Sequence, residues 1–280
     1  MDISIGLPNT LDHPGPLLIE WARRAEQRGF ASLGTIDRIV YPSYDTMTSL
    51  AAAAGATSRI RLISGVLLAP LYQPVWLAKA AASLDAISGG RLTLGLGVGG
   101  RADDFTAMGR SMRERGSDMD RALEVMRTVF DGGKLGEDEF PVARHGRPRL
   151  LIGGNSDAAV RRTIAYGQGW IGGGGSPQQL APMLERVRRE WRAAGREGEP
   201  RFAALAYFGL SDEQASRRSL STYYGFLGDM ATMVADGALR TPQALRDAVK
   251  AFEEIGLDEL ILDPSVPDIA EVDRLADAVL

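Results

Sequence analysis

The sequence predicts an α/β fold made of one domain, a (β/α)8 barrel over residues 1–280. Two observations carry this prediction: short apolar runs alternate with longer segments of helical periodicity, and the alternation repeats eight times. Units of this kind form parallel strands joined by crossover helices, and eight of them in 280 residues fit a closed barrel. A doubly wound open sheet is the alternative, because the sixth and seventh strands show the weakest patterns.

Each predicted strand is a short run of β-branched and other apolar residues, bounded by glycine, proline or polar residues. In chain order the strands span residues 3–7, 32–36, 61–68, 91–96, 149–152, 169–171, 202–209 and 259–262. Residues 132–148 are polar and contain glycine. This composition predicts a loop insertion after the fourth unit rather than a boundary between domains.

The predicted helices follow the strands and carry apolar residues at spacings of three and four. Leu18, Trp21, Ala22 and Ala25 show this spacing in the first helix, which Gly29 ends. In chain order the helices span residues 16–28, 46–56, 74–87, 119–130, 157–166, 177–194, 212–235, 242–255 and 269–279. Every predicted strand is therefore followed by at least one helix.

Composition and charge exclude several classes of function. The chain has no cysteine, which rules out disulfides, thiol nucleophiles and Cys-ligated metals. The net charge of −4 provides no basic field for nucleic acid or an anionic membrane. His13 and His145 lie far apart without metal-binding spacing, so we expect no metal site and two solvated histidines. We also expect a cytoplasmic protein, because no signal peptide or membrane-spanning run is recognisable.

Two glycine-rich clusters lie where a predicted strand ends and a helix begins. The first comprises Gly153, Gly154, Asn155 and Ser156, and the second comprises Gly172, Gly173, Gly174 and Gly175. Helix N-termini present free N–H groups and a positive dipole end, which suit a phosphate. The carboxyl ends of barrel strands meet at one face, so we expect the two clusters to form a joint phosphate site. Tight βα turns are the alternative explanation for these glycines.

Residues 95–100 match the GxGxxG dinucleotide fingerprint literally. The match lies in the fourth unit instead of the first, and residues 101–105 show no convincing helix pattern. Because the fingerprint requires a helix directly after the glycines, we reject a Rossmann interpretation.

Asp37 and Arg38 are the candidate catalytic pair, because they follow the second strand at the end where barrel active sites form. A local salt bridge or a helix cap is the alternative role for them. Several aromatic residues could line an apolar substrate cavity, although such residues are as often part of the core. They are Tyr41, Tyr44, Tyr72, Trp76 and Phe105.

Three segments closely resemble luciferase-like monooxygenases. They are RLISGVLLAPLYQPVWLAKAAASLDAISGGRLTLGLGVGG (residues 61–100), RGSDMDRALEVMRTVF (residues 115–130) and RLLIGGNSDAAVRRTIAYGQGWI (residues 149–171). The resemblance runs from the first strand to about residue 194. It implies a TIM barrel that binds reduced FMN or the deazaflavin coenzyme F-420 at the carboxyl end of its strands.

The resemblance also implies which residues contact the cofactor. The ring should rest on the end of the third strand, at a cis peptide between Gly65 and Val66. Val98, Gly99 and Gly100 should flank the ring, and the two glycine-rich clusters should hold the phosphate. Family members commonly carry a histidine where this chain has Arg38, which has no accessible neutral form and cannot act as a general base. Arg38 could instead stabilise negative charge.

These observations favour an FMN-dependent monooxygenase that uses O2 to oxidise a small organic substrate. The alternatives are an F-420-dependent reductase or dehydrogenase that transfers hydride, a cofactor-free hydrolase or isomerase with Asp37 or Asp263 as base, and a non-catalytic flavin-binding protein. The resemblance further implies a separate flavin reductase as partner. It also implies a homodimer formed through the alanine-rich helices at residues 47–56 and 78–86.

Overall fold

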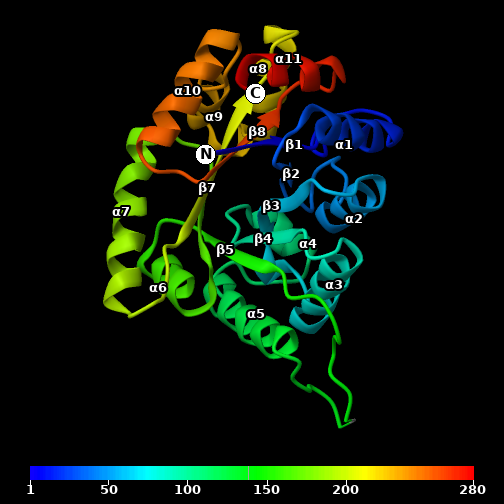
Figure 1. The fold of residues 1–280 in the computed structure, drawn as a ribbon, viewed down its shortest axis with the longest axis vertical. Helices are drawn as coiled ribbons and strands as arrows, with labels where there is room; N and C mark the ends of the chain where they lie inside the picture. The colour runs from blue at the N-terminus through cyan, green and yellow to red at the C-terminus, as the bar shows by residue number, and fades with distance from the viewer. Residues whose placement is uncertain (138) are drawn as a thin grey trace.

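The computed structural model describes residues 1–137 and 139–280 and contains a closed barrel of eight parallel strands. The strands pair in sequence order, and β1 closes the barrel against β8, as Figure 1 shows. They are β1 (Asp2–Gly6), β2 (Ser32–Thr35), β3 (Arg61–Leu68), β4 (Leu92–Gly97), β5 (Arg149–Gly153), β6 (Gly169–Gly172), β7 (Arg201–Phe208) and β8 (Glu259–Pro264). The predicted barrel is confirmed, and the open doubly wound sheet is excluded.

Helices surround the barrel and connect successive strands (Figure 1). They are α1 (Pro16–Arg28), α2 (Thr46–Ala56), α3 (Pro74–Ile87), α4 (Ala102–Ala107), α5 (Arg115–Phe130), α6 (Asp157–Tyr166), α7 (Pro177–Ala193), α8 (Glu213–Tyr223), α9 (Met230–Asp236), α10 (Pro242–Glu254) and α11 (Ala270–Val279). Two 3-10 turns, η1 (Ala69–Leu71) and η2 (Gly225–Leu227), complete the connections.

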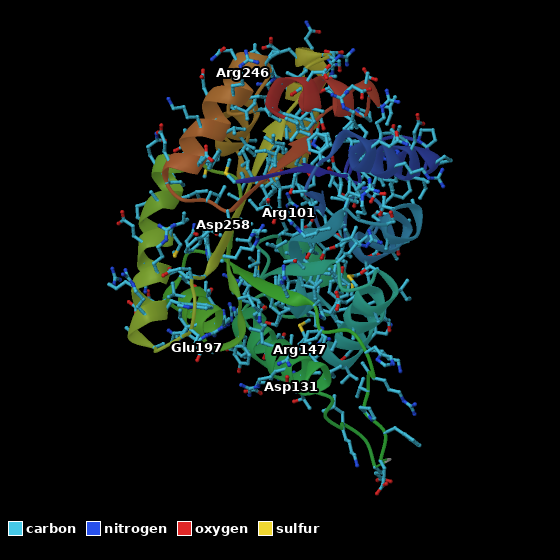
Figure 2. The ribbon with its side chains drawn as sticks, viewed as in Figure 1. Arg101, Asp131, Arg147, Glu197, Arg246 and Asp258 are labelled. Carbon is cyan, nitrogen blue, oxygen red and sulfur yellow. The ribbon has the colours of Figure 1, made fainter. Side chains whose placement is uncertain are left out.

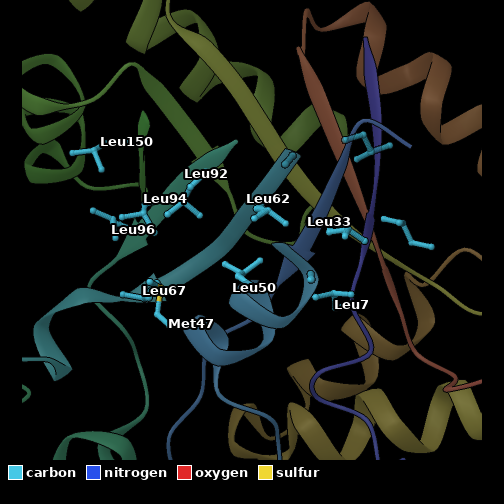
Figure 3. Packing of buried hydrophobic residues seen from close by; sticks show 14 of the residues in the cluster. Leu7, Leu33, Met47, Leu50, Leu62, Leu67, Leu92, Leu94, Leu96 and Leu150 are labelled. Atoms are coloured by element: carbon cyan, nitrogen blue, oxygen red, sulfur yellow. The ribbon is translucent and has the colours of Figure 1, made fainter. Parts of the chain in front are cut away.

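Two apolar cores stabilise the barrel. The larger core lies between strands and helices, where Leu33 and Leu62 of the strands pack with Leu50 of α2 (Figure 3). The smaller core fills the barrel and consists of Ile63, Leu151, Ile171, Ala203 and Ile261. Side chains alternate between these cores along each strand, so the residue two positions after a member of the smaller core also faces the barrel interior.

A polar network closes the amino end of the barrel. Glu259, only 3% exposed, accepts hydrogen bonds from the Ser4 hydroxyl at 2.7 Å and from Arg201 at 2.8 Å. The Ser32 hydroxyl also donates to this carboxylate. Because each buried charge here has partners, the network supports the fold and leaves the opposite end of the barrel for chemistry.

Three helix predictions are wrong in detail. Residues 102–107 do form a short helix, α4, although residues 101–105 gave no convincing helix pattern. Helix α5 begins at Arg115, four positions before the predicted start. The stretch 212–235 is not one helix, because it is broken into α8, η2 and α9, and Gly228 lies there with a φ of 59° that disfavours other residues.

The predicted insertion, residues 132–148, contains residue 138, which lies outside the described residues. Its other residues connect α5 to β5 without helix or strand and extend from the body at the bottom of Figure 1. Figure 2 shows Arg147 beside Asp131, which pair at 2.6 Å where this connection leaves the body. Within the described part of the chain, no helix is long and apolar enough to cross a membrane.

Candidate active site

The carboxyl ends of the strands and the loops that follow them form the mouth of the barrel. On one side of the mouth, residues 213–236 (α8, η2 and α9), here called the cap, pack against strand ends. After the cap the chain returns to β7, where Leu239 N–H donates to the carbonyl of Tyr207 at 2.8 Å. In Figure 1, α8 and α9 lie on the β7 and β8 side of the molecule.

An apolar cluster fixes the cap to the mouth. It contains Leu205 and Tyr207 of β7, Leu220 and Ala235 of the cap, and Ile36 from the end of β2. The hydroxyls of Tyr207 and Tyr224 lie 2.6 Å apart, within hydrogen-bond distance. Burial raises the pKa of both tyrosines, so both hydroxyls stay protonated at neutral pH. The cap therefore excludes water from the β7, β8, β1 and β2 side of the mouth.

Arg101, which follows the glycines of β4, ties the cap to the opposite side of the barrel. Its guanidinium donates to the carbonyl of Tyr223 at 3.2 Å and lies 4.3 Å from the centre of that ring. A second aromatic ring of the cap, Phe226, lies 4.2 Å from the guanidinium. Figure 2 shows Arg101 near the centre of the view, over the strands. The sequence assigned Arg101 no role, because its aromatic partner Tyr223 lies 122 positions later.

Asp37 is buried and bonded on both oxygens. Its carboxylate accepts the Leu68 N–H at 2.9 Å and the Tyr72 hydroxyl at 3.1 Å, and the residue is 4% exposed. Burial raises the pKa of Asp37 to about 6, and the bonds from Leu68 and Tyr72 offset part of that shift. The geometry makes Asp37 a link between the ends of β2 and β3.

Arg38 points away from Asp37, toward α4. Its guanidinium binds Asp103 at 2.8 Å and approaches Asp104 at 3.7 Å, and its side chain is 8% exposed. The rings of Tyr41 and Tyr223 lie 5.1 Å and 5.9 Å from it. The structure thus separates the two members of the predicted pair, and the carboxylates of α4 already balance the charge of Arg38.

The predicted cavity wall is not assembled from the predicted aromatic residues. Phe105 and Tyr72 are buried in the core, and Trp76 is 57% exposed on the outside of α3. Tyr44 donates to the carbonyl of His13 at 2.9 Å, and Tyr41 packs against Tyr223 of the cap. The aromatic groups that face the mouth come instead from β7 and from the cap, which sequence order did not indicate.

The predicted cis peptide between Gly65 and Val66 is present. Val66 packs on the core inside the barrel. A Cβ added at Gly97 would lie 2.6 Å from the Val66 side chain, and one added at Gly153 would lie 3.3 Å from it. Both glycines are therefore explained by the close approach of Val66. Val98, half-buried, follows Gly97 at the same edge.

The remaining predicted glycines fall into two groups. Gly99 and Gly154 have φ values of 77° and 107°, and a Cβ at Gly172 would lie 2.8 Å from Trp170, so local geometry accounts for these three. By contrast, a Cβ at Gly100, Gly173 or Gly174 would have open space within 4 Å. Gly175 has only ordinary contacts with Gln179 and Leu180. Open backbone therefore faces the mouth at the ends of β4 and β6.

Two helix N-termini lie beside each other at this open side. Gly153 and Ile171 are register partners in β5 and β6, and the Trp170 indole donates to the carbonyl of Gly154 at 2.8 Å. Ser156 caps α6, and Ser176 caps α7 in a capping box with Gln179. The N–H groups of Asn155, Gly173 and Gly174 donate to no other described residue. These free donors form a site that suits a phosphate.

Asp263, at the end of β8, is the most unusual polar group of the mouth. It is 1% exposed, and its Oδ1 atom has no hydrogen-bond partner among the described residues. Burial raises the pKa of this carboxyl well above its ordinary value. From the sequence, Asp263 was a candidate only for the base of a cofactor-free enzyme. Nothing in the sequence indicated that the group would be buried without a partner.

Neither histidine contributes to a metal site. His13 bonds to the carbonyls of Pro8 and Pro14, each at 2.9 Å, and His145 is exposed on the connection before β5. Across residues 1–137 and 139–280, no group of three or more His, Asp or Glu side chains is placed to hold a metal ion.

Comparisons with known proteins agree with the barrel fold. The family model described as luciferase-like monooxygenase matches residues 8–262. An uncharacterised protein of Mycobacterium tuberculosis is 30% identical over 212 residues, which cover 64% of this chain and 72% of the relative. The monooxygenase RslO1 of Streptomyces bottropensis has a similar structure, with a TM-score of 0.78, 25% identity, and coverage of 99% of this chain and 97% of RslO1.

Two further solved structures share the fold. An F420-dependent secondary alcohol dehydrogenase, solved with an F420–acetone adduct, gives a TM-score of 0.76 at 20% identity and covers 100% of this chain and 98% of its own. The oxygenating constituent of the 3,6-diketocamphane monooxygenase of Pseudomonas putida, solved with FMN, gives 0.75 at 15% identity, covering 99% and 96%. The match to the family model spans most of the chain, and the chain belongs to the luciferase-like monooxygenase family.

Proposed function

We propose that this chain is a monooxygenase that uses reduced FMN and O2 to oxidise a small organic substrate. The observation that carries the proposal is the open side of the mouth, where N–H groups that donate to no other described residue lie before two adjacent helices, next to backbone with open space around it. Membership of the luciferase-like monooxygenase family and the similarity to the monooxygenase RslO1 support it.

The residues of the open side fit a flat, phosphorylated cofactor. The phosphate would be held by Gly153–Ser156 and Gly172–Gly175, whose free N–H groups are the matching donors. The ring would rest on the Gly65–Val66 peptide beside Val98, Gly99 and Gly100, where the open space next to Gly100 leaves room for it. Asp157 adds a negative charge at the start of α6, but Arg186 pairs with it at 2.6 Å.

Reduced FMN, when bound, would supply the electrons that O2 needs to oxidise the substrate. The residues of this chain would bind and orient the cofactor and the substrate, and they would exclude water from the site. The cap covers the substrate side of the mouth, and Arg101 holds the cap closed against the end of β4. Asp37 and Arg38 act as positioning residues, because Asp37 joins the ends of β2 and β3 and Arg38 joins β2 to α4.

Titration of the purified chain with reduced FMN and with reduced F-420, without oxygen and then after oxygen is added, tests the proposal. We expect reduced FMN to bind more tightly and the bound flavin to be reoxidised in a reaction that consumes O2. Selective binding of F-420, with no oxygen consumption, would replace the monooxygenase by a hydride-transferring enzyme. Binding of neither would overturn the proposed function and return the choice to a cofactor-free enzyme.

We also propose that a separate flavin reductase supplies the reduced FMN. Two glycines of the GxGxxG match serve other purposes here: a Cβ at Gly95 would lie 2.1 Å from the carbonyl oxygen of Ser64, and Gly97 accommodates Val66. The chain therefore offers no nicotinamide site at this motif.

The homodimer implied by the sequence is likewise a proposal. Helix α3 exposes Trp76, Val75 and Ile87, which are 57%, 44% and 79% exposed, and α2 packs beside it. Large apolar side chains grouped on one helix are typical of protein interfaces. We expect light scattering to give about twice the chain mass of 30.1 kDa, and a Trp76→Glu variant to shift that mass toward the monomer. A wild-type chain that stays monomeric at high concentration would contradict the proposal.

A further inference from the structure

The side chain of Asp263 points into the barrel, at its carboxyl end. Every second residue of β8 faces the barrel interior. Glu259 belongs to the polar network at the amino end, Ile261 belongs to the core inside the barrel, and Asp263 lies in the next layer toward the carboxyl end. A Cβ added at Gly6 of β1 would lie 2.0 Å from the Oδ1 atom of Asp263, so this carboxyl occupies the space over Gly6. It therefore lies in the same layer of the mouth as the residues beneath the cap.

Asp263 differs from most other buried acids of this chain; Asp104 also has an unbonded Oδ2 atom, but its Oδ1 atom accepts two backbone N–H groups. Asp37 and Asp85 each accept two or more hydrogen bonds, and Glu271 accepts the Leu210 N–H and binds Arg274. Glu259 is likewise paired at the amino end. A buried acid that supports the fold is normally satisfied in this way, whereas an unpartnered one requires another explanation. The Oδ1 atom of Asp263 has no hydrogen-bond partner among the described residues.

A second set of polar groups lies next to Asp263. Tyr207 is its register partner in β7 and also faces the barrel interior, and the Tyr207 hydroxyl pairs with that of Tyr224 in the cap. Two hydroxyls that share one hydrogen bond leave one O–H group free to donate. The apolar residues Leu205 and Ile36 surround these groups. A small hydrogen-bonding patch thus lies in an otherwise apolar layer.

We propose that Asp263 and the Tyr207–Tyr224 pair bind an uncharged oxygen function of the substrate, such as that of a ketone, aldehyde or alcohol. This assignment rests on the proposed function and names the substrate class of the same site. Burial raises the pKa of Asp263 and so favours its protonated form, in which the carboxyl can donate a hydrogen bond as well as accept one. A substrate oxygen loses its hydrogen bonds to water when it enters a buried site. A patch with both a donor and an acceptor replaces those bonds and therefore recognises the oxygen.

Infrared spectroscopy of the full chain tests the assignment directly. The carboxylic C=O band of Asp263 is identified by its loss in Asp263→Asn, and the band is followed as cyclohexanone, cyclohexanol or methylcyclohexane is added, with and without FMN. Isothermal titration of the same probes compares wild type with two variants. Asp263→Asn keeps an N–H donor, and Asp263→Leu is of similar size but apolar. Thermal unfolding of each protein reports on folding.

We expect the ketone and the alcohol to shift the Asp263 band and the hydrocarbon to leave it unchanged. Asp263→Leu should bind the ketone about 10-fold more weakly, whereas Asp263→Asn should stay within about 3-fold of wild type. Asp263→Leu should unfold at or above the wild-type temperature, because it removes an unpartnered buried polar group.

A band that no oxygen-bearing probe shifts, or equal ketone affinity in all three proteins, would overturn the assignment. So would a marked loss of stability in Asp263→Leu, since that result would give Asp263 a structural role. The affinity for FMN is measured on the same proteins. If wild type binds no FMN and consumes no O2, the proposed function fails. The infrared comparison without FMN still decides the role of Asp263.

Discussion

Replacing Gly173 with glutamate is expected to lower the affinity for reduced FMN by about 100-fold, roughly 3 kcal/mol. Gly173 is exposed in the loop directly after β6, and its own N–H is one of the free donors there. The added side chain would have open space around its Cβ and no left-handed φ to oppose it. A carboxylate there would lie close to the phosphate that the free N–H groups are proposed to hold, and like charges repel at such short range.

The matched control is Gly173→Gln, which has nearly the same size and no charge. Its FMN affinity should fall much less than that of Gly173→Glu, and the difference between the two isolates the charge. Both variants should unfold at the wild-type denaturant concentration, because neither side chain meets an obstacle. Fluorescence titration with FMN measures the effect. Equal affinities for the two variants would place the phosphate elsewhere on the chain.

Replacing Asp37 with asparagine is expected to change how the free energy of unfolding depends on pH. Burial raises the pKa of Asp37 in the folded chain to about 6, against an ordinary value of 3.8. Between about pH 4 and pH 6 the folded chain therefore holds a proton that the unfolded chain releases. The wild-type chain should lose about 2 kcal/mol of stability relative to Asp37→Asn as the pH rises through this window.

Urea unfolding of both proteins at pH 4, 5, 6 and 7 measures this difference. Burial also raises the pKa of Asp263, so this group changes the free energy of unfolding with pH in the same direction. Asp263 is present in both proteins, and its contribution cancels in their difference. Asp120→Asn is a control of opposite sign, because a hydrogen bond from Arg162 lowers the pKa of Asp120 and its contribution is lost as pH falls. A wild-type minus Asp37→Asn difference that does not vary with pH would contradict the assigned shift.

Local sequence determined the barrel and its helix caps. Strand and helix patterns depend on the spacing of apolar residues within one segment, so eight units could be read before any contact was known. The N-cap serines at Ser156 and Ser176 bond within three residues of themselves, so these caps too depend on local sequence. The resemblance to relatives, rather than the residues themselves, predicted the cis peptide at Gly65–Val66, and the structure contains it.

Tertiary structure decided the environment of each polar group in the mouth. Arg38 pairs with Asp103 across 65 positions, and Gly97 is small because Val66 occupies the adjacent space. The cap closes over β7 and meets Arg101, and Asp263 is buried beneath it without a partner. Apolar spacing shows only whether a side chain faces inward or outward. Which group lies opposite, and whether water reaches it, depends on elements that the chain brings together only when the barrel closes.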